Sequence, residues 1–192
     1  VDYGIVHSSQ KDHERFGITY DAPLFEGWSA DKKINLVGHS FGGATIRLFY
    51  DILENGRPEE VEAAKAAGLE VSPFFEGGKG DLVYSLTAIS APHNGTTFFD
   101  ACRISANCVP SLAFRLGNIL DSTEYKGLYD LQLEHFGYTR SEDETDLEFF
   151  SRIMCSAEFK SHNDNALYDL MIDHALEIND GIGMSDSVYY FS

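Results

Sequence analysis

The amino-acid sequence predicts an α/β fold, in which helices pack on a partial parallel sheet and a helical insertion is added. Three observations support this prediction. Two apolar runs of strand length occupy 34–38 and 82–89, a helical pattern lies between them, and strand alternation is absent over 97–180. Strand, helix and strand in that order require a right-handed crossover, which makes the strands parallel. The 192 residues suffice for one sizeable core, so we expect a single domain over 1–192.

The segments before and between the two strands carry the usual signals for loops and helix ends. Residues 1–33 are punctuated by glycine and proline and are expected to be rich in loops. Apolar side chains recur at helical spacing from Phe41, and Pro58 suits the first turn of a second helix. The predicted elements are a helix over 41–54 ended by Asn55-Gly56, a helix from Pro58 that stops at Gly68, and a glycine-rich loop over 74–81.

Residues 98–180 are predicted to form the helical insertion, which covers one edge of the sheet. Short helical patterns occur around 111–120, 124–135, 145–156 and 165–176. The aromatic residues of this part include Phe98, Phe99 and Phe114. They fit either the core of a helical subdomain or an amphipathic lid. After the insertion, residues 188–191 are expected to form a returning strand.

Composition excludes several classes of partner. Lys and Arg number 14 against 31 Asp and Glu, which gives a net charge of −17 and argues against nucleic acid and anionic membrane. No apolar run reaches the roughly 20 residues of a transmembrane helix. Without an initiator Met or a signal peptide, the chain is expected to be mature, trimmed or a fragment. Cys102 and Cys108 could pair and leave Cys155 free, or all three thiols stay reduced.

The strongest chemical signal is the segment Gly38-His39-Ser40-Phe41-Gly42-Gly43, a G-x-S-x-G pattern between a predicted strand and an amphipathic helix. A nucleophilic serine needs a sharp turn at this place so that its Oγ projects above the sheet. Gly38 and Gly42 are expected to let strand and helix approach closely. The N–H of Phe41 would then point at the oxygen that becomes negative during acyl transfer. We therefore predict Ser40 as a nucleophile and Phe41 as an oxyanion donor, with a structural role for His39.

A serine hydrolase also needs a histidine base and an acid that orients it, in the order Ser, Asp or Glu, His. The histidines after Ser40 are His93, His135, His162 and His174. None follows a late strand, and we interpret His93 as a residue that orders its turn. The base and acid are therefore expected beyond Ser192, and the second oxyanion donor before Val1.

Further segments resemble one known family along nearly the whole chain. They are VDYGIVHSSQKDHERFGITY (1–20), INLVGHSFGGATIRLFYDILENG (34–56), VSPFFEGG (71–78), AISAPHNGTT (88–97), YDLQLEHFG (129–137), NDNALYDL (163–170) and VYYFS (188–192). With the Ser40 turn, they resemble the secreted zinc-containing lipases of Geobacillus and their staphylococcal relatives, which have the α/β-hydrolase fold. The match is poor over about 98–128. By this resemblance the chain is a central fragment of such an enzyme.

The resemblance implies a Ser-Asp-His triad, a helical lid and structural zinc held by two Asp and two His. The matching zinc ligands here are His7, His13 and Asp164, and the fourth would precede Val1. Without the resemblance, His7 and His13 fit either a metal site or a pair of solvated histidines. Together with a carboxylate, two imidazoles suit tetrahedral zinc. The resemblance also implies secretion, and calcium ligands beyond Ser192.

Three functions are compatible with these residues. The first is a carboxylic-ester hydrolase, in particular a triacylglycerol lipase that acts through an acyl-enzyme on Ser40 on a lipid or ester substrate, in some cases at a lipid–water interface. The second is a non-catalytic binding or structural domain of the same fold that is stabilised by a bound metal. The third is another acyl hydrolase, such as a thioesterase. Fold alone does not choose among them.

Overall fold

The computed structural model of this chain describes residues 1–98, 100, 133 and 137–192. They belong to two compact units, residues 1–95 with 172–192 and residues 96–171, and each unit is described by itself. The predicted helix at 111–120 and most of that at 124–135 lie outside the described residues. So do Phe99, Phe114, Cys102 and Cys108, and with them the pairing of the two cysteines.

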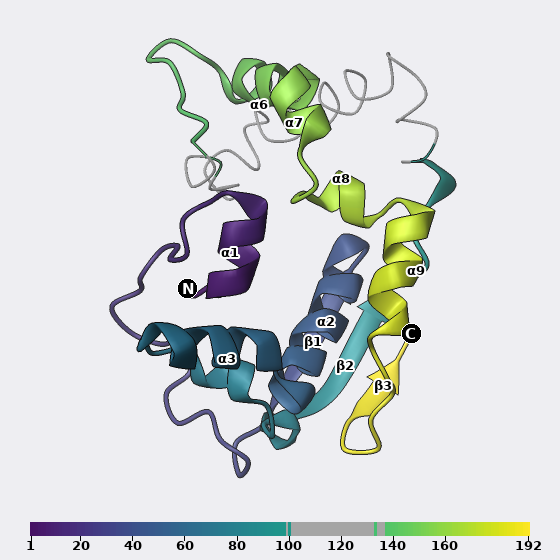
Figure 1. The fold of residues 1–192 in the computed structure, drawn as a ribbon. Helices are drawn as coiled ribbons and strands as arrows, with labels where there is room; N and C mark the ends of the chain where they lie inside the picture. The colour runs from purple at the N-terminus through teal and green to yellow at the C-terminus, as the bar shows by residue number, and fades with distance from the viewer. Residues whose placement is uncertain (99, 101–132, 134–136) are drawn as a thin grey trace. The chain divides into compact units, whose positions relative to one another are not determined.

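The first unit is built on a three-stranded sheet whose strands lie in chain order (Figure 1). The strands are β1 (Ile34–His39), β2 (Val83–Ile89) and β3 (Tyr189–Phe191). Both pairings are parallel, which confirms the predicted crossover and the returning strand. The register shifts after Ile34 and leaves Tyr84 as an extra residue in β2.

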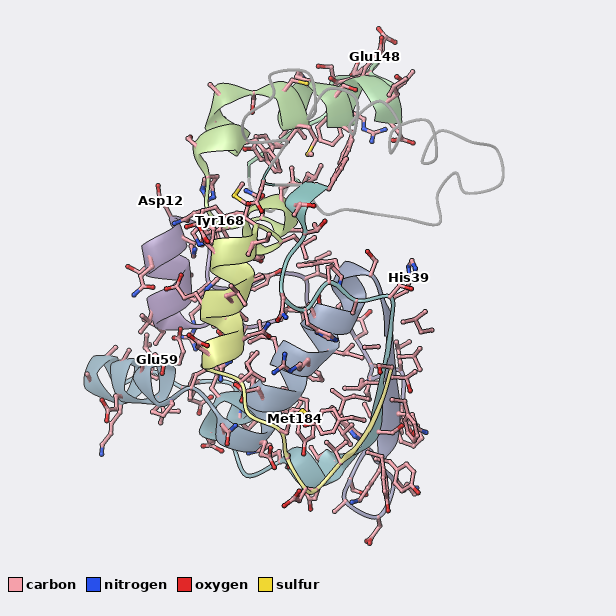
Figure 2. All side chains as sticks on the ribbon, turned by 90° about the vertical axis from the view of Figure 1, so that its right-hand side faces the viewer. Asp12, His39, Glu59, Glu148, Tyr168 and Met184 are labelled. Atoms are coloured by element: carbon pink, nitrogen blue, oxygen red, sulfur yellow. The ribbon has the colours of Figure 1, made fainter. Side chains whose placement is uncertain are left out.

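Four α-helices of this unit lie on one side of the sheet (Figures 1 and 2). They are α1 (Ile5–Lys11), α2 (Phe41–Asn55), α3 (Pro58–Ala67) and α9 (Ile172–Asp180). Gly56 and Gly68 cap α2 and α3 as predicted, since each N–H bonds back to the last helical turn. The predicted glycine-rich loop contains two 3₁₀ turns, η1 (Pro73–Glu76) and η2 (Gly80–Leu82).

Helix α1 lies inside the segment that the sequence indicates to be rich in loops. It has only seven residues, and its N-cap position is Gly4, which offers no side chain to the first N–H groups. The N–H groups of Val6 and His7 instead donate to the carboxylate of Glu60 in α3. A contact across more than fifty residues thus supports this helix, and no local signal could have shown it.

The core of the first unit lies between α2 and the sheet. Its buried side chains are Tyr50, Leu53, Val83, Leu86 and Val188. Because side chains alternate along a strand, the opposite face of the sheet carries a second apolar set. These side chains are about half exposed or more: Val37, Tyr84, Ile89, Tyr189 and Phe191.

The second unit contains three described helices, α6 (Asp146–Cys155), α7 (Ala157–Ser161) and α8 (Ala166–Asp169). A capping box between Thr145 and Glu148 begins α6, which confirms the helix predicted at 145–156. The helix predicted at 165–176 is interrupted instead. Its first part is the short helix α8, which is followed by Leu170, whose carbonyl accepts the N–H of Thr96. A separate helix, α9, begins at Ile172.

Helix α6 places its apolar face in the small core of this unit. Phe150 and Met154 are buried there and pack against Leu133, Phe159 and Leu167. Cys155, at the end of α6, is half-buried and carries a free thiol. No helix in the described part of the chain is both long and apolar enough to cross a bilayer.

Candidate active site and metal ligands

Ser40 lies in the turn between β1 and α2, at the N-cap position of the helix. Its backbone is strained, with φ 54° and ψ −126°, a conformation that residues with a side chain rarely adopt. The N–H of Ser40 donates to the carbonyl of Ile89 in β2 (2.9 Å), and the N–H of Gly43 donates to the carbonyl of Ser40 (3.0 Å). These two bonds hold the turn, and Ser40 is exposed at the end of the sheet.

Close packing around this turn requires two glycines. A Cβ on Gly38 would lie 2.2 Å from the carbonyl oxygen of Gly42, and a Cβ on Gly43 would lie 2.4 Å from the Cβ of Ala91. Gly42 itself has open space, because a Cβ there meets no described atom within 4 Å. The expectation that Gly42 permits the close approach is therefore wrong. The residue that does so is Gly43, which faces the turn after β2.

The start of α2 provides the electrostatics that acyl transfer needs. Phe41 is the first residue of the helix, and the first N–H groups of a helix have no partner within it. Those N–H groups and the helix dipole place positive potential next to Ser40. His39 is exposed and lies on the side of β1 away from α2 (Figure 2). The turn thus presents a hydroxyl and a backbone donor together.

The turn after β2 is fixed to α2 by a bridge that the sequence did not indicate. Arg47 of α2 donates to the Asn179 side-chain oxygen (2.5 Å) and to the carbonyl of Ile182 (3.0 Å). The amide of Asn179 in turn donates to the carbonyl of His93 and to the side-chain oxygen of Asn94. Asn179 lies 132 residues after Arg47, so sequence spacing carries no sign of this contact. The bridge links α2, α9 and the turn after β2.

His93 orders this turn through its backbone, in line with the expectation for it. Its ring Nδ1 is buried and has no hydrogen-bond partner among the described residues. Burial lowers the pKa of His93, and the nearby Arg47 guanidinium lowers it further. The ring is therefore held neutral at physiological pH.

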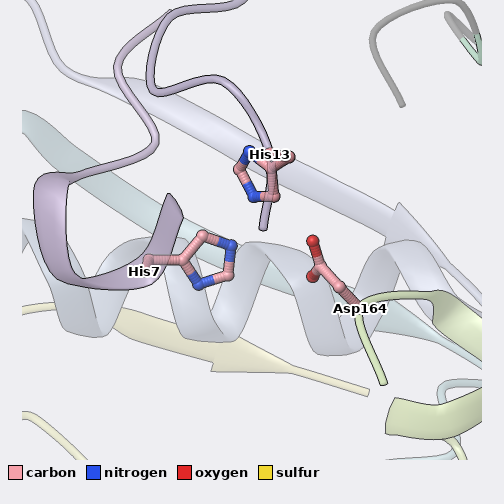
Figure 3. A group of neighbouring side chains, drawn as sticks. All are labelled: His7, His13 and Asp164. Carbon is pink, nitrogen blue, oxygen red and sulfur yellow. The ribbon is translucent and has the colours of Figure 1, made fainter. Parts of the chain in front are cut away.

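The two candidate metal ligands of the first unit lie side by side. The rings of His7, on α1, and His13, just after it, have centroids 5.2 Å apart (Figure 3). Asp12 has a left-handed backbone (φ 57°) that reverses the chain, and the N–H of His13 donates to the carbonyl of Ser8. The Nδ1 of His13 lies 2.8 Å from the carbonyl of Glu14. A carbonyl only accepts, so Nδ1 carries the proton in this contact, and in the neutral ring Nε2 is the unprotonated nitrogen.

Asp164 belongs to the second unit and directly precedes Asn165, the N-cap of α8. His7 and His13 are candidate metal ligands of the first unit, and Asp164 is a candidate ligand of the second (Figure 3). The histidine pair is a feature of the first unit alone. The participation of Asp164 stays a prediction.

A partly buried contact closes the loop that carries the histidines. The carboxylate of Asp2 receives two hydrogen bonds from Arg15, both at 2.9 Å, and one each from the N–H groups of Gly4 and Ser72. Burial opposes ionisation of Asp2, yet these hydrogen bonds outweigh it and lower the pKa of the carboxyl. The two ends of the histidine-bearing loop are thereby tied together.

A parallel α/β sheet with a serine in a strained strand–helix turn defines the class of α/β-hydrolase-like proteins. Similarity to known proteins indicates the same class and a more specific family. All of residues 1–192 match the family described as "Lipase-like, C-terminal domain", and the chain belongs to that family.

Individual relatives show the same family. The chain is 37% identical over 190 residues to a lipase of Staphylococcus epidermidis, and this match covers 99% of the chain and 27% of that lipase. The structure of EstA from Clostridium botulinum is similar at a TM-score of 0.84 and 36% identity, over 100% of this chain and 44% of that one. Lipase 1 from Pelosinus fermentans is similar at a TM-score of 0.85 and 34% identity, over 100% and 50%. The chain thus spans about a quarter of the length of the curated relatives it matches.

Proposed function

We propose that this chain carries the nucleophile of a carboxylic-ester hydrolase, specifically a triacylglycerol lipase. The observation that carries the proposal is the backbone of Ser40, which stands at φ 54° immediately before α2. Strain of this kind costs on the order of 1–3 kcal/mol and persists where the surrounding structure enforces it. Here the hydrogen bonds of Ser40 with Ile89 and Gly43 hold the turn, and Gly38 and Gly43 permit the close packing around it. Membership in a lipase-like family supports the same reaction.

In the proposed reaction, Ser40 Oγ attacks the carbonyl carbon of an ester and its proton passes to a base. The negative oxygen of the tetrahedral intermediate accepts the N–H of Phe41. Collapse of the intermediate releases the alcohol, which takes the proton from the base, and leaves an acyl group on Ser40. Water then releases the carboxylic acid by the same steps in reverse. We propose that the base and acid belong to the intact protein outside residues 1–192.

The remaining proposals follow the resemblance of the chain to secreted lipases. We propose lipid or ester substrates, action at a lipid–water interface, and secretion. Residues 98–180 are proposed as a helical insertion of a single α/β-hydrolase domain, with a lid function. The net charge of −17 supports a partner other than nucleic acid.

We also propose a structural zinc site held by His7, His13 and Asp164, with a fourth ligand outside this chain. The donor chemistry fits, since two imidazoles and a carboxylate are ligands that zinc prefers and the His7 and His13 rings are adjacent. Zinc would add stability by joining segments that are distant in sequence, and no step of ester hydrolysis involves it.

The test of the nucleophile uses the intact protein and the variants Ser40→Ala and Ser90→Ala. Ser90 is a matched control because it is also an exposed serine with a positive φ, at the end of the neighbouring strand β2. We expect Ser40→Ala to lower kcat for p-nitrophenyl esters by several orders of magnitude, about 10³-fold or more, and Ser90→Ala to retain activity.

A fluorophosphonate probe should label the parent and Ser90→Ala but not Ser40→Ala. Unchanged ester hydrolysis in Ser40→Ala would refute the assignment. Turnover of acyl-CoA without turnover of oxygen esters would instead indicate a thioesterase. Lack of any acyl turnover by the intact protein, with no labelling, would favour the non-catalytic alternative.

A further inference from the structure

We propose that Glu60 is a positioning residue for metal binding, because it fixes the backbone of His7. This inference rests on the proposed zinc site. Glu60 lies on α3, outside the candidate ligand group, and acts on His7 only through the main chain. Its role is therefore to place a ligand and not to touch the metal.

Glu60 uses both of its carboxylate oxygens on helix α1. Its Oε2 accepts the N–H of Val6 and its Oε1 accepts the N–H of His7, both at 2.8 Å. These are N–H groups of the first turn of α1, which have no partner within the helix. The side chain of Glu60 takes the place of the capping side chain that Gly4 lacks. His7 is thus held at its own backbone by a charged acceptor.

The environment of Glu60 shows that this contact is tightly built. Glu60 is only 4% exposed, although its neighbours Glu59 and Glu62 on the same helix are exposed. A Cβ on Gly4, whose φ is 93°, would lie 2.4 Å from the Cδ of Glu60. The carboxylate therefore packs directly against the backbone of Gly4. Burial of a carboxylate is costly, and here hydrogen bonds to the start of α1 offset the cost.

The other histidine is held by a second set of contacts. The Asp2–Arg15 pair ties the two ends of the loop, and the carbonyl of Glu14 orients the His13 ring. The ring of Tyr3 also packs edge-on against the His13 ring, with centroids 5.4 Å apart. Glu60 is accordingly a support of the His7 backbone. With both supports in place, the two imidazoles are arranged before a metal binds.

Arrangement of ligands in advance raises affinity, because binding then costs less ordering of the chain. Residues that orient metal ligands typically change metal affinity about 10–100-fold when they are replaced. In Glu60→Gln one carboxylate oxygen becomes an amide that cannot accept an N–H, so one of the two bonds is lost. We expect this variant to bind zinc at least about tenfold more weakly. Glu62→Gln removes the same charge from the same helix at an exposed position and should leave the affinity unchanged.

The experiment measures the zinc Kd of the intact parent, Glu60→Gln and Glu62→Gln by competition with a chromogenic chelator. The melting temperature of each metal-free protein is measured in parallel, and the Kd is determined well below the lowest of these temperatures. Where Glu60→Gln does not fold, Glu60→Asp, which keeps the charge and shortens the side chain, replaces it in the same comparison. A weakened zinc Kd in the folded Glu60 variant, with Glu62→Gln unchanged, supports the proposal.

Two results would overturn it, and they are distinguishable. If the Glu60 variant melts at a lower temperature but keeps its zinc Kd within about twofold, Glu60 serves stability only. If the parent itself binds no zinc, or binds it equally well after His7→Ala, the metal site is wrong and the role of Glu60 fails with it. Neither result would affect the proposed hydrolase function, which is tested separately by ester hydrolysis of the parent.

Discussion

Replacement of Gly38 by alanine tests whether the Ser40 turn depends on close contact between β1 and α2. The added methyl group would lie 2.2 Å from the carbonyl oxygen of Gly42, 2.4 Å from its carbonyl carbon and 2.6 Å from the nitrogen of Gly43. Heavy atoms pack best at about 3.5–4.0 Å, so the backbone must shift by roughly 1 Å. The obstacles are main-chain atoms of the first turn of α2 and cannot rotate away.

Overpacking of a well-packed region costs typically about 1–3 kcal/mol, and an obstacle made of backbone lies at the upper end. We therefore expect Gly38→Ala to lower the free energy of unfolding by about 3 kcal/mol. Gly42→Ala is the matched control, because its methyl group meets no described atom within 4 Å. Where the backbone is compatible, Gly to Ala stabilises by about 0.4–1 kcal/mol. The two variants should thus differ by more than about a hundredfold in the unfolding equilibrium constant.

The assay is urea unfolding of the intact protein, with the slope compared between variants to establish that the same surface is exposed. Activity is measured at the same time, since displacement of the turn should also displace Ser40. A Gly38→Ala protein within about 0.5 kcal/mol of the parent, or a Gly42→Ala protein as unstable as Gly38→Ala, would refute the reasoning.

Two further predictions concern the loop that carries the histidines. Chelation of zinc should lower the melting temperature of the intact protein, since a metal that binds the folded state stabilises it. The variant His7→Ala should show no such effect of the chelator. Equal melting temperatures of the parent with and without chelator would contradict the zinc site. Hydrogen bonds from Arg15 and two backbone N–H groups lower the pKa of Asp2 below its ordinary value of 3.8, so its contribution to stability is present above that value and is lost as the pH falls through the folded-state pKa. Asp2→Asn should consequently be less stable than the parent at pH 7, with a difference that shrinks below pH 4; a difference independent of pH contradicts the ion pair.

The parts of the fold that could be predicted from sequence are those specified by neighbouring residues. The end of α2 follows from Gly56, and both ends of α3 follow from Pro58 and Gly68, because the effects of these residues act within one helical turn. The parallel pairing of β1 with β2 follows from the crossover between them. The Ser40 turn was visible for the same reason, because the chemistry needs particular residue types at short spacing, whereas His7 and His13 were proposed as ligands through the family resemblance.

What only the tertiary structure decided depends on residues that are distant in sequence. Helix α1 exists because Glu60, more than fifty residues later, receives its first N–H groups. Gly43 and not Gly42 faces Ala91, which is a matter of how α2 is rotated against the turn after β2. Arg47 meets Asn179 across 132 residues. Periodicity and capping report only what occurs within a few residues, whereas these contacts arise when the assembled core brings separate segments together.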